Sequence, residues 1–344
     1  MPCQLVKQGY KAGSCLTRIN NEDKKACDVT LKKEGPLWHR LIKSAHLSRP
    51  EHYFSIYQSG CNHHCLKCHS ADFSQSAVGS WISSAEIGSA AKEYEKQVTI
   101  QENREKATMW HGTDLCRSCG TCVISGTRSP LCPGVLDPKD VVLSPQGYGP
   151  ARNIVAFTGG DISCCVDFYC QTAEEIKSNC QNMWVLIETN GYGLTPENLD
   201  RFKESGVDSF WLDIKAYDEE IYKKLCGTTN EWILKAPREM TERDFILELL
   251  TLFIPGWVED NQIEKIAKLA HEVNPEIPIT ILAFFPAHKM KDTAPPSLSD
   301  MVRIYQKIRE IGLNNVKLGN CGVFARTAQD WEHLLKKVGK EGIG

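Results

Sequence analysis

Three closely spaced cysteines place the tightest constraint on this sequence. Cys61, Cys65 and Cys68 form the pattern C-x3-C-x2-C, directly after an apolar, β-prone run that ends at Gly60. We therefore expect the cysteines on a loop that leaves a strand. Three thiolates on one short loop can hold three corners of a cubane iron–sulfur cluster, which leaves the fourth iron open to a small molecule.

A zinc knuckle is the alternative interpretation of the same loop. Structural zinc sites normally close with four ligands, and His63, His64 or His69 offers a fourth ligand here. We favour the open cluster, and the residues described below strengthen that preference.

Length and composition indicate a globular protein with a sizeable core. The chain has 344 residues, of which 42% are hydrophobic and 24% charged. The formal charge of −3 gives no indication of a nucleic-acid partner. No run approaches the ~18 apolar residues of a membrane span, and the first residues lack the apolar stretch of a signal peptide. We therefore expect a cytoplasmic protein without a transmembrane segment.

A second group of cysteines also has ligand-like spacing. The chain has 16 cysteines, and in a reducing compartment tight spacings indicate metal sites before disulfides. Cys116, Cys119, Cys122 and Cys132 form C-x2-C-x2-C-x9-C-P. The first three and the Cys-Pro ending resemble bacterial ferredoxin ligation. This predicts one auxiliary four-iron cluster, with a zinc site as the alternative.

We expect the remaining cysteines to be ordinary thiols. A further cluster is the alternative for two groups, although adjacent cysteines are poor joint ligands. A substrate-side thiol or hydrogen donor is the alternative for the last cysteine. The first group is Cys3, Cys15 and Cys27, the second is Cys164, Cys165, Cys170 and Cys180, and the others are Cys226 and Cys321.

Hydrophobic periodicity divides the chain into three parts. Residues 1–50 are polar and mixed, which predicts an N-terminal extension with a short amphipathic helix over 38–46. Residues 51–97 and 151–344 alternate short apolar runs with helical stretches, which is typical of β/α units and a parallel sheet. Residues 98–150 lose this periodicity and are interpreted as an insertion that carries the auxiliary cluster.

The apolar runs predict six or seven parallel strands. The predicted strands cover 53–59, 153–157, 184–188, 209–213, 249–254, 277–284 and 315–318. The predicted helices run from 83–86 to about 97, with Ser84 as N-cap, and over 173–182, 196–205, 218–225, 240–247, 261–273, 298–311 and 327–338.

Polar or glycine-rich sequence follows four of these strands, at residues 158–161, 188–191, 213–215 and 284–288. In a barrel-like sheet, ligands bind where the carboxyl ends of the strands converge. Turn formation alone explains any single cluster of this kind. Together with the cysteine loop, however, five clusters point to one face, which favours a binding site there.

These motifs resemble those of the radical S-adenosylmethionine superfamily, and within it the activating enzymes of glycyl radical enzymes, such as pyruvate formate-lyase activase. The similarity covers about residues 53–69 and 150–320. The sequence departs from the family at Lys67, where an aromatic residue is usual, and at Leu250, where the activases carry arginine. The matching residues are the cluster cysteines Cys61, Cys65 and Cys68; Thr158, Gly159, Gly160 and Asp161, with Asp in place of Glu; Glu188, Thr189 and Asn190; Asp213 and Lys215; and His288.

The resemblance implies a fold and an activity. The expected fold is α/β, a partial (β/α)6-type TIM barrel with an inserted, ferredoxin-like iron–sulfur segment. The expected reaction is reductive cleavage of S-adenosylmethionine to a 5′-deoxyadenosyl radical, which abstracts hydrogen from a substrate. The leading substrate is a glycine of a partner enzyme. A low-potential electron donor, ferredoxin or flavodoxin, is implied as a partner.

The resemblance also implies roles for the strand-end residues. Residues 158–161 and 188–190 and His288 would bind the cofactor, with Asp161 accepting a hydrogen bond from its amino group. Glu188 and Asp213 would help to hold a monovalent cation. Lys215 would neutralise the cofactor carboxylate, so that Asp213 and Lys215 belong to the catalytic site as positioning residues.

Two alternatives remain open from the sequence. The first is hydrogen abstraction from an unactivated carbon of a peptide, small molecule or lipid chain, leading to C–C or C–S bond formation. The second is a non-catalytic iron–sulfur or zinc protein, which would not require the strand-end motifs.

Overall fold

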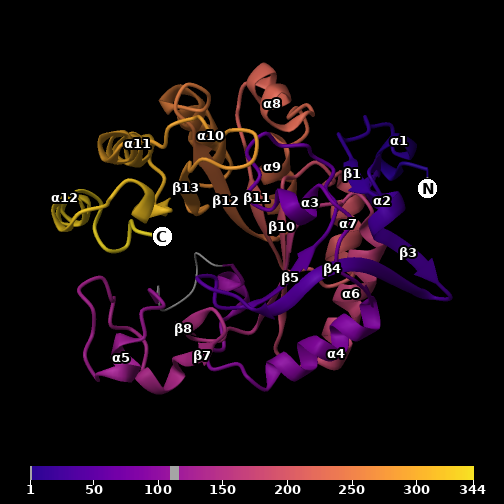
Figure 1. The fold of residues 1–344 in the computed structure, drawn as a ribbon, viewed down its shortest axis with the longest axis horizontal. Helices are drawn as coiled ribbons and strands as arrows, with labels where there is room; N and C mark the ends of the chain where they lie inside the picture. The colour runs from indigo at the N-terminus through magenta and orange to yellow at the C-terminus, as the bar shows by residue number, and fades with distance from the viewer. Residues whose placement is uncertain (1, 109–115) are drawn as a thin grey trace.

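The structure, a computed structural model, describes residues 2–108 and 116–344 (Figure 1). Within these residues one ten-stranded sheet has the order β14-β13-β12-β11-β10-β9-β5-β4-β3, with β6 beside β4. Two further hairpins pair β1 with β2 and β7 with β8. The strands are β1 (Leu16–Ile19), β2 (Glu22–Lys25), β3 (Leu31–Glu34), β4 (Leu37–Leu47), β5 (Phe54–Gln58), β6 (Ser80–Ser83), β7 (Val142–Ser144), β8 (Gly147–Gly149), β9 (Ile154–Gly159), β10 (Trp184–Thr189), β11 (Ser209–Asp213), β12 (Ile246–Phe253), β13 (Ile279–Ala283) and β14 (Val316–Gly319).

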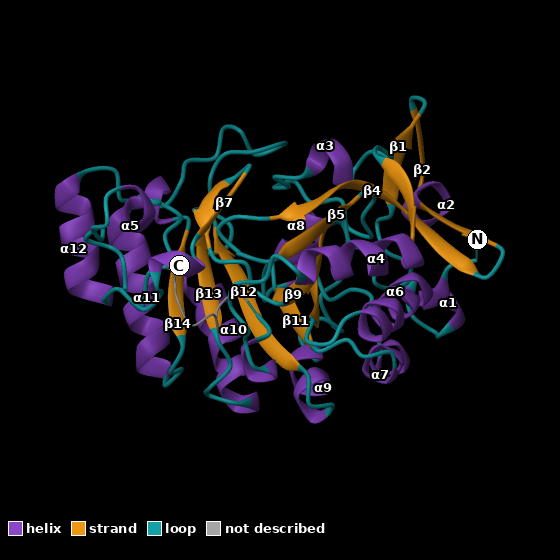
Figure 2. Cartoon of the chain, turned by 90° about the horizontal axis from the view of Figure 1, so that it is seen from below, coloured by secondary structure: helices purple, strands orange, loops and turns teal. Residues whose placement is uncertain are grey.

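Helices connect successive strands of the sheet, and Figure 2 shows α6, α7, α9 and α10 along one side of it. The helices are α1 (Gln4–Lys7), α2 (Ala26–Thr30), α3 (Ala71–Ser74), α4 (Ser84–Glu95), α5 (Thr121–Ile124), α6 (Val166–Asn179), α7 (Pro196–Glu204), α8 (Glu219–Cys226), α9 (Ala236–Glu242), α10 (Asp260–Val273), α11 (Leu298–Ile311) and α12 (Ala328–Val338), with short 3-10 turns at Arg104–Lys106, Pro138–Asp140 and Cys321–Val323.

Seven of the described strands, from β5 through β9 to β14, pair in parallel. The sheet does not close on itself within the described chain, because β5 pairs with the antiparallel β4 and β14 ends the path. The predicted α/β fold with a partial barrel is therefore confirmed, and every predicted strand overlaps an observed one.

Alternate residues of each strand point to opposite faces of the sheet, so the two faces belong to different layers of the protein. Phe157, Ile187 and Leu212 belong to the main core, which the helices cover. The side chains between them point to the opposite face of the sheet. That face carries Thr158 and Glu188, so polar groups line the interior of the open barrel.

Three sequence predictions are wrong in detail. The helix expected over 38–46 is strand β4, because pairing with β3, β5 and β6 overrides its amphipathic pattern. The helix expected over 240–247 is α9, which ends before β12 begins. The N-cap of α4 is Ser83 rather than Ser84, since the Ser83 hydroxyl accepts from the Glu86 N–H in a capping box.

Residues 98–150, the predicted insertion, form only short elements among the described residues. These are α5, β7, β8 and two 3-10 turns, and Figure 1 shows α5, β7 and β8 together below the sheet. The ferredoxin-like character of this segment stays a prediction. None of the described helices has the length and apolar character that a membrane crossing needs.

Arg40 of β4 ties the N-terminal strands to the carboxyl ends of β5 and β9. Its side chain is fully buried, and its guanidinium donates to the carbonyl oxygens of Gly60 and Gly160, each at 3.2 Å. It also reaches the Thr30 hydroxyl at 3.4 Å. One buried cation therefore connects the strand that precedes the three cysteines with the glycine-rich turn after β9.

We predict that Arg40→Ala lowers the free energy of unfolding by about 2–4 kcal/mol, because two buried carbonyl oxygens lose their charged donor. Lys43→Ala, on an exposed position of the same strand, is the matched control. Urea unfolding of both variants gives the difference. Equal stabilities would contradict the connecting role of Arg40.

Candidate active site

The cysteine loop, residues 61–68, follows β5 and is held by backbone hydrogen bonds to three other segments. The Asn62 N–H donates to the Asp161 carbonyl oxygen at 2.7 Å, which attaches the loop to the turn after β9. The Leu66 N–H donates to the Leu225 carbonyl oxygen at 2.7 Å, at the end of α8. The Lys289 N–H donates to the Leu66 carbonyl oxygen at 3.1 Å, from the segment after β13. The loop thus lies where the carboxyl ends of the strands converge.

Side chains join the cysteine loop to two of the predicted motifs. Asp161 accepts hydrogen bonds from the Thr189 hydroxyl at 2.7 Å and from the Asn190 N–H at 2.9 Å. The Asn190 amide in turn donates to the Asn62 side-chain oxygen at 2.7 Å. Residues of the cysteine loop, the turn at 158–161 and the end of β10 therefore form one network, here called the Asn62–Asp161–Asn190 network.

The Asp161 carboxylate is occupied mainly by its own chain. Besides the bonds from Thr189 and Asn190, it accepts the Ser163 N–H at 2.7 Å, and the residue is only 6% exposed. The structure thus gives Asp161 a role in holding strand ends together. Its expected contact with a cofactor amino group stays a prediction.

Glycines at 159 and 160 permit close backbone approach. Gly159 has φ +87°, a conformation that favours glycine. A Cβ atom on Gly160 would lie 2.4 Å from the Gly60 carbonyl oxygen. Any larger residue at 160 would therefore push the turn away from the strand that leads to the cysteines.

Each thiol of the cysteine loop has a polar neighbour. The Cys61 sulfur accepts the His63 N–H at 3.4 Å, and the Cys68 sulfur lies 3.1 Å from the Ser74 hydroxyl. The Cys65 thiol is hydrogen-bonded to the Cys226 thiol and lies in the field of the Lys215 ammonium group. Burial raises the pKa of Cys61 and Cys68, and the hydrogen bond with Cys226, followed by burial, raises the pKa of Cys65.

These residues fit a four-iron cluster. Three sulfur atoms on one partly buried loop, with N–H and O–H donors beside two of them, match the ligand chemistry of such clusters. Among residues 2–108 and 116–344, no three Cys, His, Asp or Glu side chains converge tightly enough to share one metal ion. A cluster imposes a different geometry, because each thiolate binds its own iron.

The predicted alternative of a histidine ligand is not supported for His63. Its Nδ1 lies 3.0 Å from the Asn62 side-chain oxygen, and its Nε2 lies 2.9 Å from the Tyr222 hydroxyl and 3.1 Å from the Thr228 hydroxyl. Burial lowers the pKa of His63 to about 3. This histidine is therefore a neutral, hydrogen-bonded component of the core.

Glu188 lies in the barrel interior. The Tyr53 hydroxyl donates to one of its carboxylate oxygens at 3.0 Å, and the Thr158 hydroxyl donates to the other. Burial, followed by the charge of Glu51, raises the pKa of Glu188 to about 8. Two predicted site residues, Thr158 and Glu188, are thereby brought together.

Asp213 and Lys215 form an ion pair at the end of β11. Burial acts to lower the pKa of Lys215, but the attraction of Asp213 and the nearby Cys65 raises it overall. The second carboxylate oxygen of Asp213 is buried and has no hydrogen-bond partner among the described residues. The ion pair is therefore formed, and the second carboxylate oxygen of Asp213 remains available to accept a hydrogen bond from a ligand.

The segment after β13 covers the cysteine loop. The Lys67 ammonium group lies 3.9 Å from the centre of the Phe285 ring, and burial lowers the pKa of Lys67 to about 8. His288 has a buried Nε2 without a hydrogen-bond partner in the described part of the chain. The His288 ring lies near His64 of the cysteine loop. Burial lowers the pKa of His64, and the positive charges of Lys289 and His288 lower it further.

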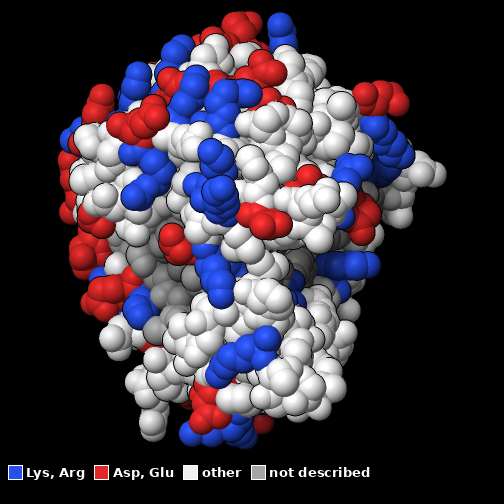
Figure 3. All heavy atoms as spheres, turned by 90° about the vertical axis from the view of Figure 1, so that its left-hand side faces the viewer, with Lys and Arg blue, Asp and Glu red and all other residues white. Residues whose placement is uncertain are grey.

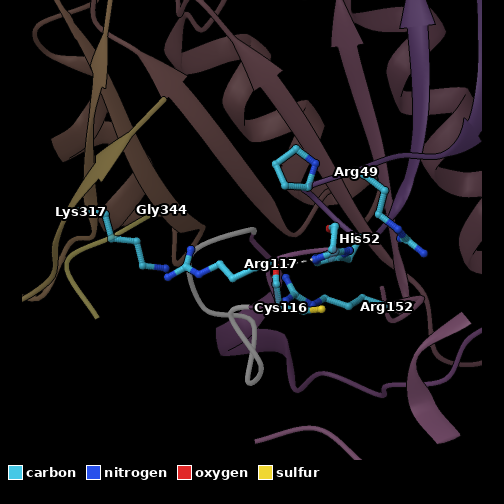
Figure 4. Close-up of a pocket in the computed structure, with 9 residues that line it drawn as sticks. Arg49, His52, Cys116, Arg117, Arg152, Lys317 and Gly344 are labelled. Atoms are coloured by element: carbon cyan, nitrogen blue, oxygen red, sulfur yellow. Dashed lines mark hydrogen bonds between the residues drawn. The ribbon is translucent and has the colours of Figure 1, made fainter. Parts of the chain in front are cut away.

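A cavity of about 360 Å³ lies at the opposite, amino-terminal ends of the strands. Its lining includes four basic residues, of which Arg152 forms a buried ion pair with Glu102 at 3.6 Å, and Figure 4 shows the Lys317 and Arg117 side chains pointing toward each other. His52 lies beside the insertion, with Nε2 3.2 Å from the Cys116 carbonyl oxygen. The lining residues are Arg49, Pro50, His52, Cys116, Arg117, Ser118, Arg152, Lys317 and Gly344.

Two cysteines of the insertion have donors beside their sulfur atoms. The Cys119 sulfur accepts from the Thr121 hydroxyl at 3.3 Å, which lowers the pKa of this thiol. The Cys132 sulfur lies 3.7 Å from the Arg128 guanidinium. The structure does not bring Cys116, Cys119, Cys122 and Cys132 to a common metal ion, and the auxiliary cluster stays a prediction.

The surface shows no large field of one sign on the face drawn in Figure 3, where basic and acidic side chains are interspersed. This mixture agrees with the formal charge of −3.

Sequence reasoning missed several residues of the site. Tyr53, Asn62 and Cys226 contact predicted site residues, and Arg40 supports the turn at 160. The spacing of motifs along the sequence did not indicate that Arg40 or Cys226 belongs to the site, because both residues reach it through tertiary packing. The position of Asn62, directly beside Cys61, was the one available signal.

Parts of this chain resemble known proteins. The sequence profile of the Radical SAM superfamily matches residues 116–270, a range that contains the motifs at 158–161, 188–191 and 213–215 and begins after the cysteine loop. A crystal structure of a domain of pyruvate-formate lyase-activating enzyme from Bacteroides vulgatus is similar at 23% identity and a TM-score of 0.40, covering 48% of this chain and 98% of that one.

Two curated relatives are activating enzymes by name. A glycyl-radical enzyme activating enzyme of Methanocaldococcus jannaschii is 27% identical over 147 residues, 42% of this chain and 54% of that protein. The trans-4-hydroxy-L-proline dehydratase activating enzyme of Clostridioides difficile is 27% identical over 144 residues, 42% of this chain and 46% of that enzyme. The chain spans about half the length of these relatives. It resembles the radical SAM superfamily and, within it, the activating enzymes.

The raised pKa of Glu188 gives a pH prediction. Below pH about 4.5 the carboxyl is protonated in the folded and unfolded chain alike. Between 4.5 and about 8 only the unfolded state loses the proton, so this group makes folding less favourable as pH rises. We therefore expect Glu188→Gln, which does not titrate, to become increasingly more stable relative to the unmodified chain from pH 5 to pH 8, with a plateau above.

Denaturant unfolding at several pH values, in buffers without alkali cations, measures this difference. Glu310→Gln, at an exposed position of α11, controls for the loss of one carboxylate. A stability difference for Glu188→Gln that is constant from pH 5 to pH 9 would contradict the account.

Proposed function

We propose that this chain, whose motifs resemble those of the radical SAM superfamily, cleaves S-adenosylmethionine reductively and starts radical chemistry on a substrate. Cys61, Cys65 and Cys68 would hold a four-iron cluster, and the chemistry that the cluster would supply is one-electron cleavage of the sulfonium to methionine and a 5′-deoxyadenosyl radical, which would take a hydrogen atom from the substrate. The leading substrate is a glycine of a partner enzyme.

The observation that carries this proposal is the Asn62–Asp161–Asn190 network. It connects the cysteine loop with the turn after β9 and the end of β10 through hydrogen bonds of 2.7–2.9 Å. A zinc knuckle or a simple electron carrier needs no such connection. A cofactor that must touch the cluster and the strand ends at once does need it, because its reacting bond requires a fixed position.

The residues of this chain have separate tasks in the proposed reaction. The backbone at Gly159 and Gly160 gives the cofactor amino group close access to the strand edge. Lys215, oriented by Asp213, balances the negative charge of a carboxylate, and Lys67 adds a second positive charge beside it. The core residues around His63 exclude water from the radical.

The insertion has a role apart from cofactor binding. It packs at the amino-terminal ends of the strands, next to the cationic cavity, whereas the cysteine loop lies at the carboxyl ends. A cluster on Cys116, Cys119, Cys122 and Cys132 would serve electron entry from a low-potential donor, ferredoxin or flavodoxin, or would accept an electron from a substrate radical. A monovalent cation between Glu188 and Asp213 is part of the same proposal.

A protein glycine is the first substrate choice because both curated relatives are named as activating enzymes. The cationic cavity favours a second candidate, hydrogen abstraction from a substrate that carries an anionic group. Burial of Arg117 lowers its pKa, and an anion beside the guanidinium would offset that cost. Activity on a partner glycyl radical enzyme, measured by its radical signal, separates the two candidates.

We expect Cys61→Ala, Cys65→Ala and Cys68→Ala to abolish 5′-deoxyadenosine formation with dithionite, since each removes one of three cluster ligands. Chromatographic assay of 5′-deoxyadenosine measures the loss. Cys180→Ala, at the end of α6, is the matched control and keeps the activity.

Cys226→Ala is the discriminating variant, because its thiol contacts Cys65 but is not one of the three ligands. It should retain cleavage. Product formation at the normal rate in Cys61→Ala, or complete loss in Cys226→Ala, would place the ligands elsewhere than proposed.

Asp213→Ala tests the positioning role of the ion pair. Losing a charge-assisted contact should weaken S-adenosylmethionine binding by about 1–3 kcal/mol, while the iron content stays unchanged because Asp213 is not a ligand. Calorimetric titration and thermal unfolding of the same variant separate two roles. Unchanged affinity with a lowered melting temperature would mean that the pair only stabilises the fold.

A further inference from the structure

A row of polar and aromatic side chains crosses the interior face of the sheet. The strand register pairs Tyr57 of β5 with Thr158 of β9. It also pairs Glu188 of β10 with Trp211 of β11, and Trp211 with Glu248 of β12. The Thr158 hydroxyl donates to Glu188, which connects the two parts. Residues in register on neighbouring strands share a face of the sheet, so all five side chains face the barrel interior. They are here called the interior row.

The interior row is accessible to a ligand. In closed barrels the interior is filled by layers of side chains, but four side chains of the row are only partly buried. These four are Tyr57, Thr158, Glu188 and Trp211. Trp211 stands two residues before Asp213 on the same strand, and its indole Nε1 is buried without a hydrogen-bond partner among the described residues. The row therefore lies next to the ion pair of the candidate site.

Negative charge gathers in the interior row. Among the described residues, the partners of the Glu188 carboxylate are two hydroxyl groups, those of Tyr53 and Thr158, which bring no positive charge. Glu248 is fully buried. Burial, followed by the charges of Glu188, Glu51 and Glu248, raises the pKa of the Tyr53 hydroxyl. Three carboxyl groups thus act on one buried hydroxyl group.

Glu51 brings an unsatisfied acceptor to this region. It lies two residues before Tyr53, whose hydroxyl donates to Glu188 at 3.0 Å. The Oε2 atom of Glu51 is buried and has no hydrogen-bond partner in the described part of the chain. A buried carboxylate oxygen without a donor is costly. This oxygen therefore favours a ligand that carries N–H donors.

The basic residues nearest to the row are directed elsewhere. Lys215 forms the ion pair with Asp213. Lys317 of β14 lines the cavity at the amino-terminal ends of the strands, where its side chain points toward Arg117 (Figure 4). The row itself is not part of the lining of that cavity. Its carboxylates and aromatic rings are the groups that attract an organic cation, since aromatic faces and carboxylates both favour positive charge.

We propose that the interior row binds a primary ammonium group of the substrate. An ammonium group has three N–H donors that point in different directions, which suits carboxyl groups on separate strands. A planar guanidinium group matches one carboxylate through two parallel bonds instead. The ammonium donors satisfy the buried oxygen of Glu51, and its charge compensates Glu188 and Glu248.

This inference rests on the proposed function and names the substrate class for the same site. The substrate is a molecule whose reacting carbon lies close to an amine nitrogen. The ammonium group belongs to a small amine or to a lysine side chain beside the target glycine.

Thermal unfolding of the full chain, prepared without oxygen, tests the proposal with n-butylammonium chloride as the probe. The probe should raise the melting temperature by several degrees more than potassium chloride at the same ionic strength, because it binds the folded chain preferentially. Neutral butan-1-ol should cause no such rise. A rise with n-butylammonium that does not exceed the rise with potassium overturns the proposal.

Glu248→Gln should lose most of the rise in melting temperature that n-butylammonium causes. Glu310→Gln, at an exposed position of α11, is the matched control and should keep it. An undiminished rise in Glu248→Gln overturns the proposal. If Glu248→Gln fails to fold, the comparison of n-butylammonium, potassium and butan-1-ol on the unmodified chain still decides.

The same measurement identifies the source of the ammonium group. A short peptide with adjacent glycine and lysine that acts at lower concentration than n-butylammonium supports a lysine side chain, and the reverse order supports a small amine. The measurement requires no cleavage of S-adenosylmethionine. Formation of 5′-deoxyadenosine without an n-butylammonium effect would overturn this inference alone, whereas an n-butylammonium effect in a protein that forms no 5′-deoxyadenosine would overturn only the proposed function.

Discussion

The hydrogen bonds around Asn62 hold the candidate site together. The Asp161 carbonyl after β9 and the Asn190 amide after β10 both bond to this one residue of the cysteine loop, and its side-chain oxygen also lies 3.0 Å from the ring of its neighbour His63. Arg40 stabilises the same region, because its guanidinium donates to the carbonyl oxygens of Gly60 and Gly160. Because these groups are buried, each lost bond leaves an unsatisfied polar atom. The loop can therefore keep one position, as the proposed electron transfer to a bound cofactor requires.

The two ends of the open barrel differ in chemistry. At the carboxyl ends of the strands lie thiols, the Asp213–Lys215 ion pair and a buried polar network. At the amino ends lies a cationic cavity beside Cys116 of the insertion. Glu188 occupies the interior between the two ends, bonded to Tyr53 and Thr158. This division suits a substrate that enters the interior and meets cofactor chemistry at one end only.

Sequence patterns predicted the parallel strands well, because their short apolar runs are buried whatever the remote contacts. They failed for β4, whose amphipathic pattern was interpreted as a helix and whose strand form depends on β3, β5 and β6. Motif spacing located the cysteine loop and the strand-end residues, but not their partners. Arg40, Tyr53 and Cys226 reach the site only through the tertiary fold, which spacing along the chain does not reveal.

The central claim is that the cluster on the cysteine loop has an iron open to S-adenosylmethionine. Electron paramagnetic resonance of the anaerobically reduced chain, recorded before and after addition of S-adenosylmethionine, tests it most directly. Subtraction of the Cys61→Ala spectrum removes the signals of any other cluster. The account predicts a change in the g values on addition, because the amino and carboxylate groups bind the open iron. A reduced-cluster signal that S-adenosylmethionine leaves unaltered would show a closed cluster and contradict the account.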